Sequence, residues 1–372
     1  VRPQNIEHLA ACVSISRPGA LAYIGDYAKF VNYAEIKPFH PAFDEALKNT
    51  GNIIIYQEQI NKICMEIYGM SAEDSDEIRR CVGKKDRNGI KKWEPIIIDA
   101  GKKQNIPQEV TEKFWDTINK SADYLFNAGH AFSYATITAQ TTYLKTNHPK
   151  EFFVSLLRMA KFEPNPIEVI SKVNVELRHF GITLLPPDIL KSDIDFKVIG
   201  SDILFGLGSI KGVSEKTIEK LNKFRQPHSN KFEIFTGAKE AGLSIGTLTS
   251  LIAVGCLNMP DKRSKLVYEA QLFNLLTLKE KSYVLELGPS LNFNLVACLQ
   301  EILKRKDEKG RPLIKESRIE TLKKRSLGYK KMFESNSKHE KLASFCNERF
   351  FLGYSYSTTL IDIYKNVASL NS

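Results

Sequence analysis

The sequence predicts a mainly α-helical protein that contains one small β-hairpin. Apolar residues recur at the three- and four-residue spacing of helices over most of the 372 residues. Short β-type runs at residues 196–199 and 203–207 flank Gly200 and Ser201, which is the pattern of a hairpin. Helical spacing returns at Ser214 and continues through a Lys-rich tail, so we expect helices on both sides of the hairpin.

The first part of the chain predicts short helices joined by turns. Arg17-Pro18-Gly19 is one such turn, and the apolar run at residues 53–56 predicts a buried segment that leads into a helix through Met65. Ser71, followed by acidic residues, predicts a helix over residues 72–85 with Ser71 as its N-cap.

Residues 108–160 are helical in pattern, with breaks at Gly129 and at His148-Pro149. Another amphipathic helix is predicted over residues 164–180, and a Pro-containing loop then precedes the hairpin. These changes of pattern divide the chain into three expected regions, residues 1–180, 181–257 and 258–372.

Charge and cysteine usage restrict the class of protein. Lys and Arg number 53 against 43 Asp and Glu, a formal charge of +10, which favours a polyanionic partner and nucleic acid first. The six cysteines show no C-x-x-C spacing, so we expect reduced thiols in a cytoplasmic protein rather than a zinc site or a disulfide framework. No apolar run approaches the roughly 18 residues of a membrane span, so no membrane partner is expected.

The end of the predicted helix over residues 72–85 is strongly basic. Five cations fall within nine positions, and arginine forks bind phosphate oxygens well, so a nucleoside triphosphate or a DNA backbone would fit there. A solvated helix terminus is the alternative, since cations also complement the helix dipole. The five residues are Arg79, Arg80, Lys84, Lys85 and Arg87.

A second anion site is expected where the helix after residue 126 begins. Asn127, His130 and Ser133 lie at or near that start, where unpaired backbone N–H groups and the helix dipole favour phosphate. A capped core helix with one satisfied histidine is the alternative.

The segment at residues 205–218 resembles a helix-hairpin-helix motif, whose turn amides and following helix hold a DNA phosphate. Ser214 stands where the second glycine of that motif usually stands, and a weaker second copy ends at residues 251–257. An ordinary Gly-rich loop is the alternative. The acidic group Asp188, Asp193 and Asp195 would suit Mg²⁺, but turn capping explains it better, so we expect no metal ligands.

Taken in order, these motifs are similar to landmarks of the alpha subunit of bacterial DNA polymerase III, the C-family replicative polymerase. The resemblance covers roughly residues 2–257, with a faint continuation at residues 351–354. The landmarks are Ser16-Arg17-Pro18-Gly19, Tyr56-Gln57-Glu58-Gln59, Arg79-Arg80-Cys81-Val82-Gly83-Lys84-Lys85, Phe126-Asn127-Ala128-Gly129-His130-Ala131, Tyr143-Leu144-Lys145, Leu185-Pro186-Pro187-Asp188-Ile189 and residues 205–213.

The resemblance implies a helical fingers domain over residues 1–180 and a duplex-binding region with tandem helix-hairpin-helix motifs over residues 181–257, before a helical tail of unclear role. It implies that Arg79, Arg80, Asn127 and His130 bind the incoming dNTP. It implies that primer-template DNA is bound by Lys84, Lys85, Lys211, Gly212, Val213, Ser214 and Lys216.

The resemblance also implies what lies outside residues 1–372. The palm carboxylates that hold Mg²⁺ would be upstream, so we expect no catalytic residue here and no primer extension by this chain alone. The palm would come from a missing upstream segment or from a separate subunit of a split polymerase. A sliding clamp is a further expected partner, although its peptide match, Gln271-Leu272-Phe273, fits a helix face better.

One departure from the family pattern supports a second hypothesis. The family's pocket usually reads Asn-Lys-Ser-His, whereas this chain has Asn127-Ala128-Gly129-His130, so a phosphate-facing lysine is missing. The alternative function is therefore a non-catalytic DNA-binding or polymerase-regulating protein derived from polymerase fingers. An unrelated helical scaffold is the third hypothesis.

Overall fold

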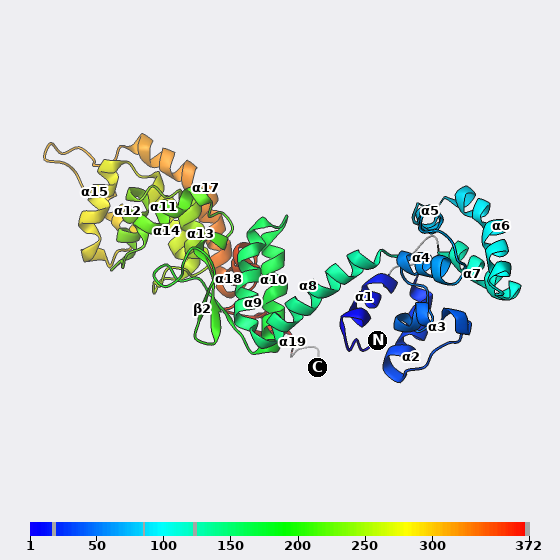
Figure 1. The fold of residues 1–372 in the computed structure, drawn as a ribbon. Coiled ribbons are helices and arrows are strands. Elements are labelled where there is room, and N and C mark those ends of the chain that lie inside the picture. Colours follow the sequence, from blue (N-terminus) through cyan, green and yellow to red (C-terminus); the bar gives the residue numbers. More distant parts are fainter. Residues whose placement is uncertain (17–19, 85, 122–124, 369–372) are drawn as a thin grey trace. The chain divides into compact units, whose positions relative to one another are not determined.

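The computed structural model describes residues 1–16, 20–84, 86–121 and 125–368. They form two compact units, residues 1–147 and residues 148–372, which are described separately (Figure 1). The predicted fold class is confirmed, since both units are built mainly of helices and the strands form one small sheet. Among the helices described, none combines the length and apolar character needed to cross a membrane.

The first unit contains eight α-helices within its described residues. The expected N-cap at Ser71 is confirmed, because its side chain accepts a hydrogen bond from the Asp74 N–H. The predicted turn at Arg17-Pro18-Gly19 lies outside the described residues. The helices are α1 (Ile6–Ile15), α2 (Ile24–Tyr33), α3 (Pro41–Leu47), α4 (Gln57–Glu66), α5 (Ala72–Gly83), α6 (Arg87–Lys103), α7 (Gln108–Ser121) and α8 (Ala128–Asn147).

The apolar run at residues 53–56 is buried, as expected, and it makes a long-range contact that the sequence did not indicate. Tyr56 forms a parallel β-bridge with Phe126. The Phe126 N–H donates to the Ile55 carbonyl at 3.1 Å, and the Gln57 N–H donates to the Phe126 carbonyl at 2.9 Å. The bridge therefore places the start of α4 beside the start of α8.

Two apolar clusters support this arrangement. In one, α3 to α7 surround the stacked rings of Tyr68 and Phe114, whose centroids are 5.4 Å apart. In the other, α1 packs along α8 through small residues, among them Ala11 and Ala135. Small side chains let two helices approach closely, so α1 braces the first half of α8.

The second unit holds the remaining helices and the sheet. The hairpin around Gly200 is confirmed as β2 (Lys197–Ile199) paired antiparallel with β3 (Asp202–Leu204). A third strand, β1 (Leu184–Leu185), runs parallel to β3 in a segment expected to be a loop. The helices are α9 (Pro149–Met159), α10 (Pro166–Leu177), α11 (Glu215–Phe224), α12 (Lys231–Glu240), α13 (Ile245–Ala253), α14 (Arg263–Leu275), α15 (Leu278–Leu287), α16 (Leu295–Lys304), α17 (Glu316–Lys338), α18 (Glu340–Leu352) and α19 (Leu360–Ala368).

One apolar core joins the whole second unit. It runs from Phe153 in α9 to Tyr354 after α18, and the Tyr354 hydroxyl donates to the Leu184 carbonyl at 3.1 Å. The expected boundaries at residues 180 and 257 therefore fall inside one packed body, and the three regions stay predictions about function.

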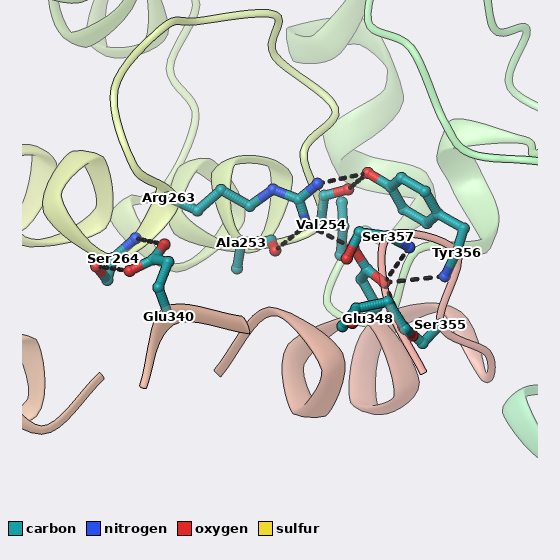
Figure 2. A network of polar contacts seen from close by, with 10 residues as sticks. Ala253, Val254, Arg263, Ser264, Glu340, Glu348, Ser355, Tyr356 and Ser357 are labelled. Atoms are coloured by element: carbon teal, nitrogen blue, oxygen red, sulfur yellow. Dashed lines mark hydrogen bonds and ion pairs between the residues drawn. The ribbon is translucent and has the colours of Figure 1, made fainter. Parts of the chain in front are cut away.

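A polar network attaches α18 to the end of α13 (Figure 2). Glu348 is fully buried, and its carboxylate accepts hydrogen bonds from Arg263 at 2.6 Å, from the Ser355 hydroxyl at 2.7 Å and from the Tyr356 N–H at 2.9 Å. Burial alone would raise the pKa of Glu348, but these bonds outweigh it and hold the pKa below its usual value. Tyr356 completes the link, because its hydroxyl donates to the Val254 carbonyl at 2.7 Å.

Candidate nucleic-acid interface

The start of α8 is already occupied by a carboxylate of the chain itself. Asn127 caps the helix, since its Oδ1 accepts the His130 N–H at 2.8 Å. Its Nδ2 donates to Glu58 Oε1 at 2.6 Å, and the Ala128 N–H donates to Glu58 Oε2 at 2.9 Å. Glu58, from α4, therefore lies at the positive end of α8, where an external anion was expected.

His130 lies three residues after Asn127 and is exposed. Its ring is 4.7 Å from the Tyr134 ring in an edge-to-face arrangement and 5.4 Å from the Phe126 ring, measured between centroids. The Ser133 hydroxyl turns back to the Gly129 carbonyl at 2.9 Å, so it serves the helix. All three residues of the predicted trio are exposed, but the side chains of Asn127 and Ser133 are hydrogen-bonded within the chain.

Arg79 and Arg80 share one acidic partner. Both Nε and Nη2 of Arg79 lie 2.8 Å from Asp76 Oδ1, and Arg80 Nε lies 2.8 Å from Oδ2. The hydrogen bond from Arg79, with both guanidinium charges, holds the pKa of Asp76 below its usual value. The Arg80 side chain is 66% exposed, so most of its fork still faces solvent.

Gln57 connects the basic end of α5 to the entry of α8. Its Oε1 accepts from Arg79 Nη1 at 3.4 Å, and its Nε2 donates to the Leu125 carbonyl at 3.2 Å. Gly83, in the last turn of α5, lies against the Gln57 side chain, and an added Cβ would be 3.3 Å from Gln57 Nε2. The structure thus brings together the two predicted anion sites, Arg79–Arg80 and Asn127–His130, through Gln57 and Glu58.

Sequence reasoning did not name Gln57 and Glu58 as site residues. The available signal was the Tyr56-Gln57-Glu58-Gln59 landmark, whose last member also has a structural role. The Gln59 side chain accepts the N–H groups of Ile55 and Tyr56 at 2.8 and 2.9 Å. Lys84 is exposed just past α5, whereas Lys85 lies outside the described residues.

The hairpin of the predicted helix-hairpin-helix motif is a different segment from the β2–β3 hairpin. It lies between a short 3₁₀ turn (Leu207–Ser209) and α11, and we call it the DNA-binding hairpin. Gly212 has φ +94°, a left-handed conformation that side chains disfavour. Ser214 is the N-cap of α11 and its hydroxyl lies 2.9 Å from that of Thr217, while Lys216 is exposed on the first turn. Lys211, Gly212, Ser214 and Lys216 are exposed and Val213 is half-buried against the core, and together they form the connection into a helix N-terminus.

Lys211 is held at this connection by the end of α18. Its N–H donates to the Phe351 carbonyl at 3.0 Å, and its Nζ lies 3.8 Å from the centroid of the Phe350 ring. A second helix pair, α12 and α13, follows, with Gly242 at φ +77° in its turn and Ser244 capping α13.

The three aspartates considered for Mg²⁺ serve three separate places. Asp188 accepts the N–H groups of Leu190 and Lys191 at 2.9 and 3.0 Å, which caps a turn. Asp193 pairs with Lys197 at 3.0 Å, and Asp195 with Lys161 at 3.3 Å. Across the part of the chain that the structure describes, no group of three metal-ligating side chains gathers.

The expected clamp-binding peptide is also assigned to another role. Leu272 and Phe273 are buried in the core of the second unit, and both lie in α14. Gln271-Leu272-Phe273 is thus a helix face rather than an accessible peptide, as the sequence analysis favoured, and a sliding clamp as a partner stays a prediction without this peptide.

Family models match two parts of the chain in the predicted order. Residues 1–105 match the bacterial DNA polymerase III alpha subunit finger domain, and residues 181–266 match a helix-hairpin-helix motif. The chain carries the fingers and helix-hairpin-helix portion of the bacterial DNA polymerase III alpha family. The recognition made from the sequence landmarks is confirmed.

Individual relatives agree with this assignment. The chain is 30% identical to DNA polymerase III subunit alpha of Thermus aquaticus over 276 residues, which is 72% of this chain and 22% of the relative. It is 34% identical to the same subunit of Campylobacter jejuni over 268 residues, 69% of this chain and 22% of the relative. It is 32% identical to the same subunit of Caulobacter vibrioides over 223 residues, which is 59% of this chain and 19% of the relative. The chain thus spans about a fifth of the length of these relatives.

Proposed function

We propose that residues 1–372 form the fingers and duplex-binding part of a replicative DNA-directed DNA polymerase, and that this part binds the incoming dNTP and the primer-template. The observation that carries the proposal is that Gln57 connects Arg79 to the entry of α8; Gln57 and Arg79 both lie in residues 1–105, which are similar to polymerase fingers. Arginine cations suit a triphosphate, and the exposed His130 imidazole suits a base edge.

Binding of a triphosphate at this place requires an exchange of partners. Arg79 and Arg80 would transfer their forks from the Asp76 carboxylate to phosphate oxygens, which have the same bidentate geometry. His130 would then face the nascent base pair. Lys84 and Lys85 would contact DNA phosphates nearby.

The duplex would bind in the second unit. Lys211, Gly212, Val213, Ser214 and Lys216 combine backbone amides, a helix N-terminus and exposed cations, which is a sequence-independent way to hold a DNA phosphate. Mg²⁺ would be held by palm carboxylates supplied from outside residues 1–372, by another polypeptide or by an upstream segment. Mg²⁺ supplies charge stabilisation for phosphoryl transfer, while the groups described here position the nucleotide and the DNA.

Primer extension tests the proposal directly. The chain is assayed with Mg²⁺, primer-template and four dNTPs, first alone and then together with proteins that co-purify with it. We expect extension only in the mixture, and duplex binding by the chain alone that falls steeply with salt. Charge reversal of Lys211 and Lys216 should weaken binding to every DNA sequence about equally; a strong sequence preference in the loss contradicts the backbone assignment.

The alternative is a non-catalytic DNA-binding or polymerase-regulating protein derived from fingers. One observation favours it: Ala128 stands where the family pattern has a phosphate-facing lysine. Equilibrium binding of a labelled dNTP in the presence of primer-template separates the two. Template-dependent dNTP binding supports the polymerase part, and duplex binding without any dNTP binding supports the regulator.

A further inference from the structure

A groove of about 550 Å³ lies beside the predicted DNA-binding hairpin in the second unit. One wall is the hairpin backbone at residues 208–213, and another is the start of α10 with the preceding residues Pro164 and Asn165. The remaining wall is formed by Arg349 and Phe350, which belong to α18 in the C-terminal region whose role the sequence did not indicate.

The end of α18 is fixed to both other walls. The Phe351 carbonyl accepts the Lys211 N–H at 3.0 Å, which joins α18 to the hairpin. Gly353, at φ +90°, lets the chain turn directly against α10, because an added Cβ would lie 2.6 Å from the Ile167 carbonyl. α18 and α10 are neighbours in the fold (Figure 1). The groove is thus a fixed feature of the second unit.

The groove carries positive charge without acidic neighbours in its lining. Lys161, Lys211 and Arg349 line it, and among the described lining residues none is Asp or Glu. Lys161 has an outside partner, Asp195 at 3.3 Å. Arg349 is exposed and forms no ion pair with any residue that the structure describes; its guanidinium carbon lies 5.7 Å from the Phe345 ring.

Phe350 gives the Lys211 ammonium a defined position. The Nζ lies 3.8 Å from the ring centroid, within the range of a cation–π contact. The ring itself is 54% exposed, so the contact leaves the ammonium open to solvent on its other side. An ammonium held in this way loses less freedom when it binds a phosphate.

We propose that this groove binds the phosphate backbone of one strand of a DNA duplex, with Arg349 as a direct phosphate ligand and Phe350 as the positioning residue for Lys211. The proposal rests on the duplex binding proposed above and extends it from the hairpin to α18. The C-terminal region would then supply part of the duplex grip.

The number of phosphate contacts can be counted from the salt dependence of binding. Fluorescence anisotropy of a labelled 20-base-pair duplex is measured with the full chain between 50 and 300 mM salt. The slope of log K against log salt is negative, and Arg349→Gln should make it less steep by about 0.9, since one counterion release is lost. Binding should weaken roughly eightfold at 0.1 M salt. Arg325→Gln is the matched control: Arg325 is exposed on α17 and does not line the groove, so the slope should not change.

The role of Phe350 is tested by a double-mutant cycle. Phe350→Leu should weaken binding about two- to fivefold with an unchanged salt slope, because the lysine charge remains but is no longer positioned. In a Lys211→Met background, Phe350→Leu should cause no further loss of DNA affinity. If Phe350 only supported the fold, Phe350→Leu would weaken DNA binding by the same factor in both backgrounds. Phe350→Tyr should restore the affinity.

The outcomes separate this inference from the proposed function. If the unaltered chain does not bind duplex DNA, both fail. If it binds, and Lys216→Gln lowers the salt slope while Arg349→Gln behaves like Arg325→Gln, the groove assignment fails and the hairpin assignment stands. Thermal unfolding of each variant confirms that the fold is retained, and a destabilised Arg349→Gln is replaced by Arg349→Met, which removes the charge but keeps an unbranched side chain and should give the same smaller slope.

Discussion

Glu58 Oε1 accepts a hydrogen bond from Asn127 Nδ2 at 2.6 Å, although the two residues lie on different helix starts. The same carboxylate also receives the first amide of α8. The Glu58 carboxylate thus lies at the helix start where the proposed triphosphate would add further negative charges. Glu58 both stabilises the entry to α8 and opposes the binding of an anion there.

Glu58→Gln separates these two effects. The amide retains a hydrogen-bond acceptor but removes the charge from the helix N-terminus, so we expect a loss of about 0.5–1 kcal/mol in the free energy of unfolding and tighter dNTP binding at low salt. Both are measured on the same preparations, by denaturation and by labelled-dNTP titration. Glu66→Gln, in the last turn of α4, is the control and should leave dNTP affinity unchanged. Weaker dNTP binding by Glu58→Gln would mean that Glu58 positions the site rather than opposing the ligand.

Arg79 and Arg80 are expected to act on the nucleotide and not on binary DNA binding. Replacing both with Gln should raise the dNTP concentration needed for template-dependent binding by roughly tenfold or more, because two charged hydrogen bonds to phosphate are lost. Duplex affinity without dNTP should remain within about twofold. Asp76→Asn should act in the opposite direction, since it frees both forks. If duplex affinity collapses as well, the two arginines contact the template.

Gly212 and Gly200 allow a matched comparison of backbone strain. Both have positive φ, +94° for Gly212 and +60° for Gly200. Gly200 lies in the turn between β2 and β3, whereas Gly212 lies in the helix-hairpin-helix turn that is predicted to hold DNA. Each change to Ala should destabilise the fold by about 1 kcal/mol, because an alanine side chain disfavours this conformation. Only Gly212→Ala should also weaken duplex binding. Equal effects of the two variants on DNA affinity would exclude a specific role for the hairpin.

The lowered pKa of Lys281 predicts that the free energy of unfolding increases at alkaline pH. Burial, followed by the nearby Lys239 ammonium, lowers the pKa of Lys281 from 10.5 to about 8. Between these values the unfolded chain binds more protons than the folded chain, so the free energy of unfolding increases as the pH rises from 8 to 10.5. Lys281→Met should raise the stability at pH 7 and flatten this part of the profile. Denaturant titrations at pH 7, 8, 9 and 10 measure both; an unchanged slope in Lys281→Met would assign the titration to another group.

Local features of this fold were predictable because their causes are local. Ser71 precedes acidic residues and caps α5, and Gly200 with Ser201 turns between two β-type runs. Strand β1 was missed because Pro186 and Pro187 follow it directly and its partner, β3, is distant in sequence. A short parallel pairing of that kind has no local signal.

The candidate site shows the same division between local and distant causes. Arg79 and Asn127 were identified from charge and from helix position, but their connection passes through Gln57 and Glu58, which hydrogen-bond to residues far along the chain. The contribution of Arg349 to the groove was not accessible either, since nothing in its own surroundings in sequence connects it to Lys211. The alternative interpretation of Gln271-Leu272-Phe273 as a helix face was correct because its apolar members follow the spacing of the α14 core.

The bridge between Tyr56 and Phe126 has an evolutionary consequence. Its hydrogen bonds hold the start of α4 beside the start of α8, while Phe43 and Leu47 of α3 pack into the same core as α4 to α7. An exchange of this region between related chains would therefore keep its packing only if α3 moved together with α4 to α7. The Tyr56–Phe126 bridge would be the junction to preserve at the other end.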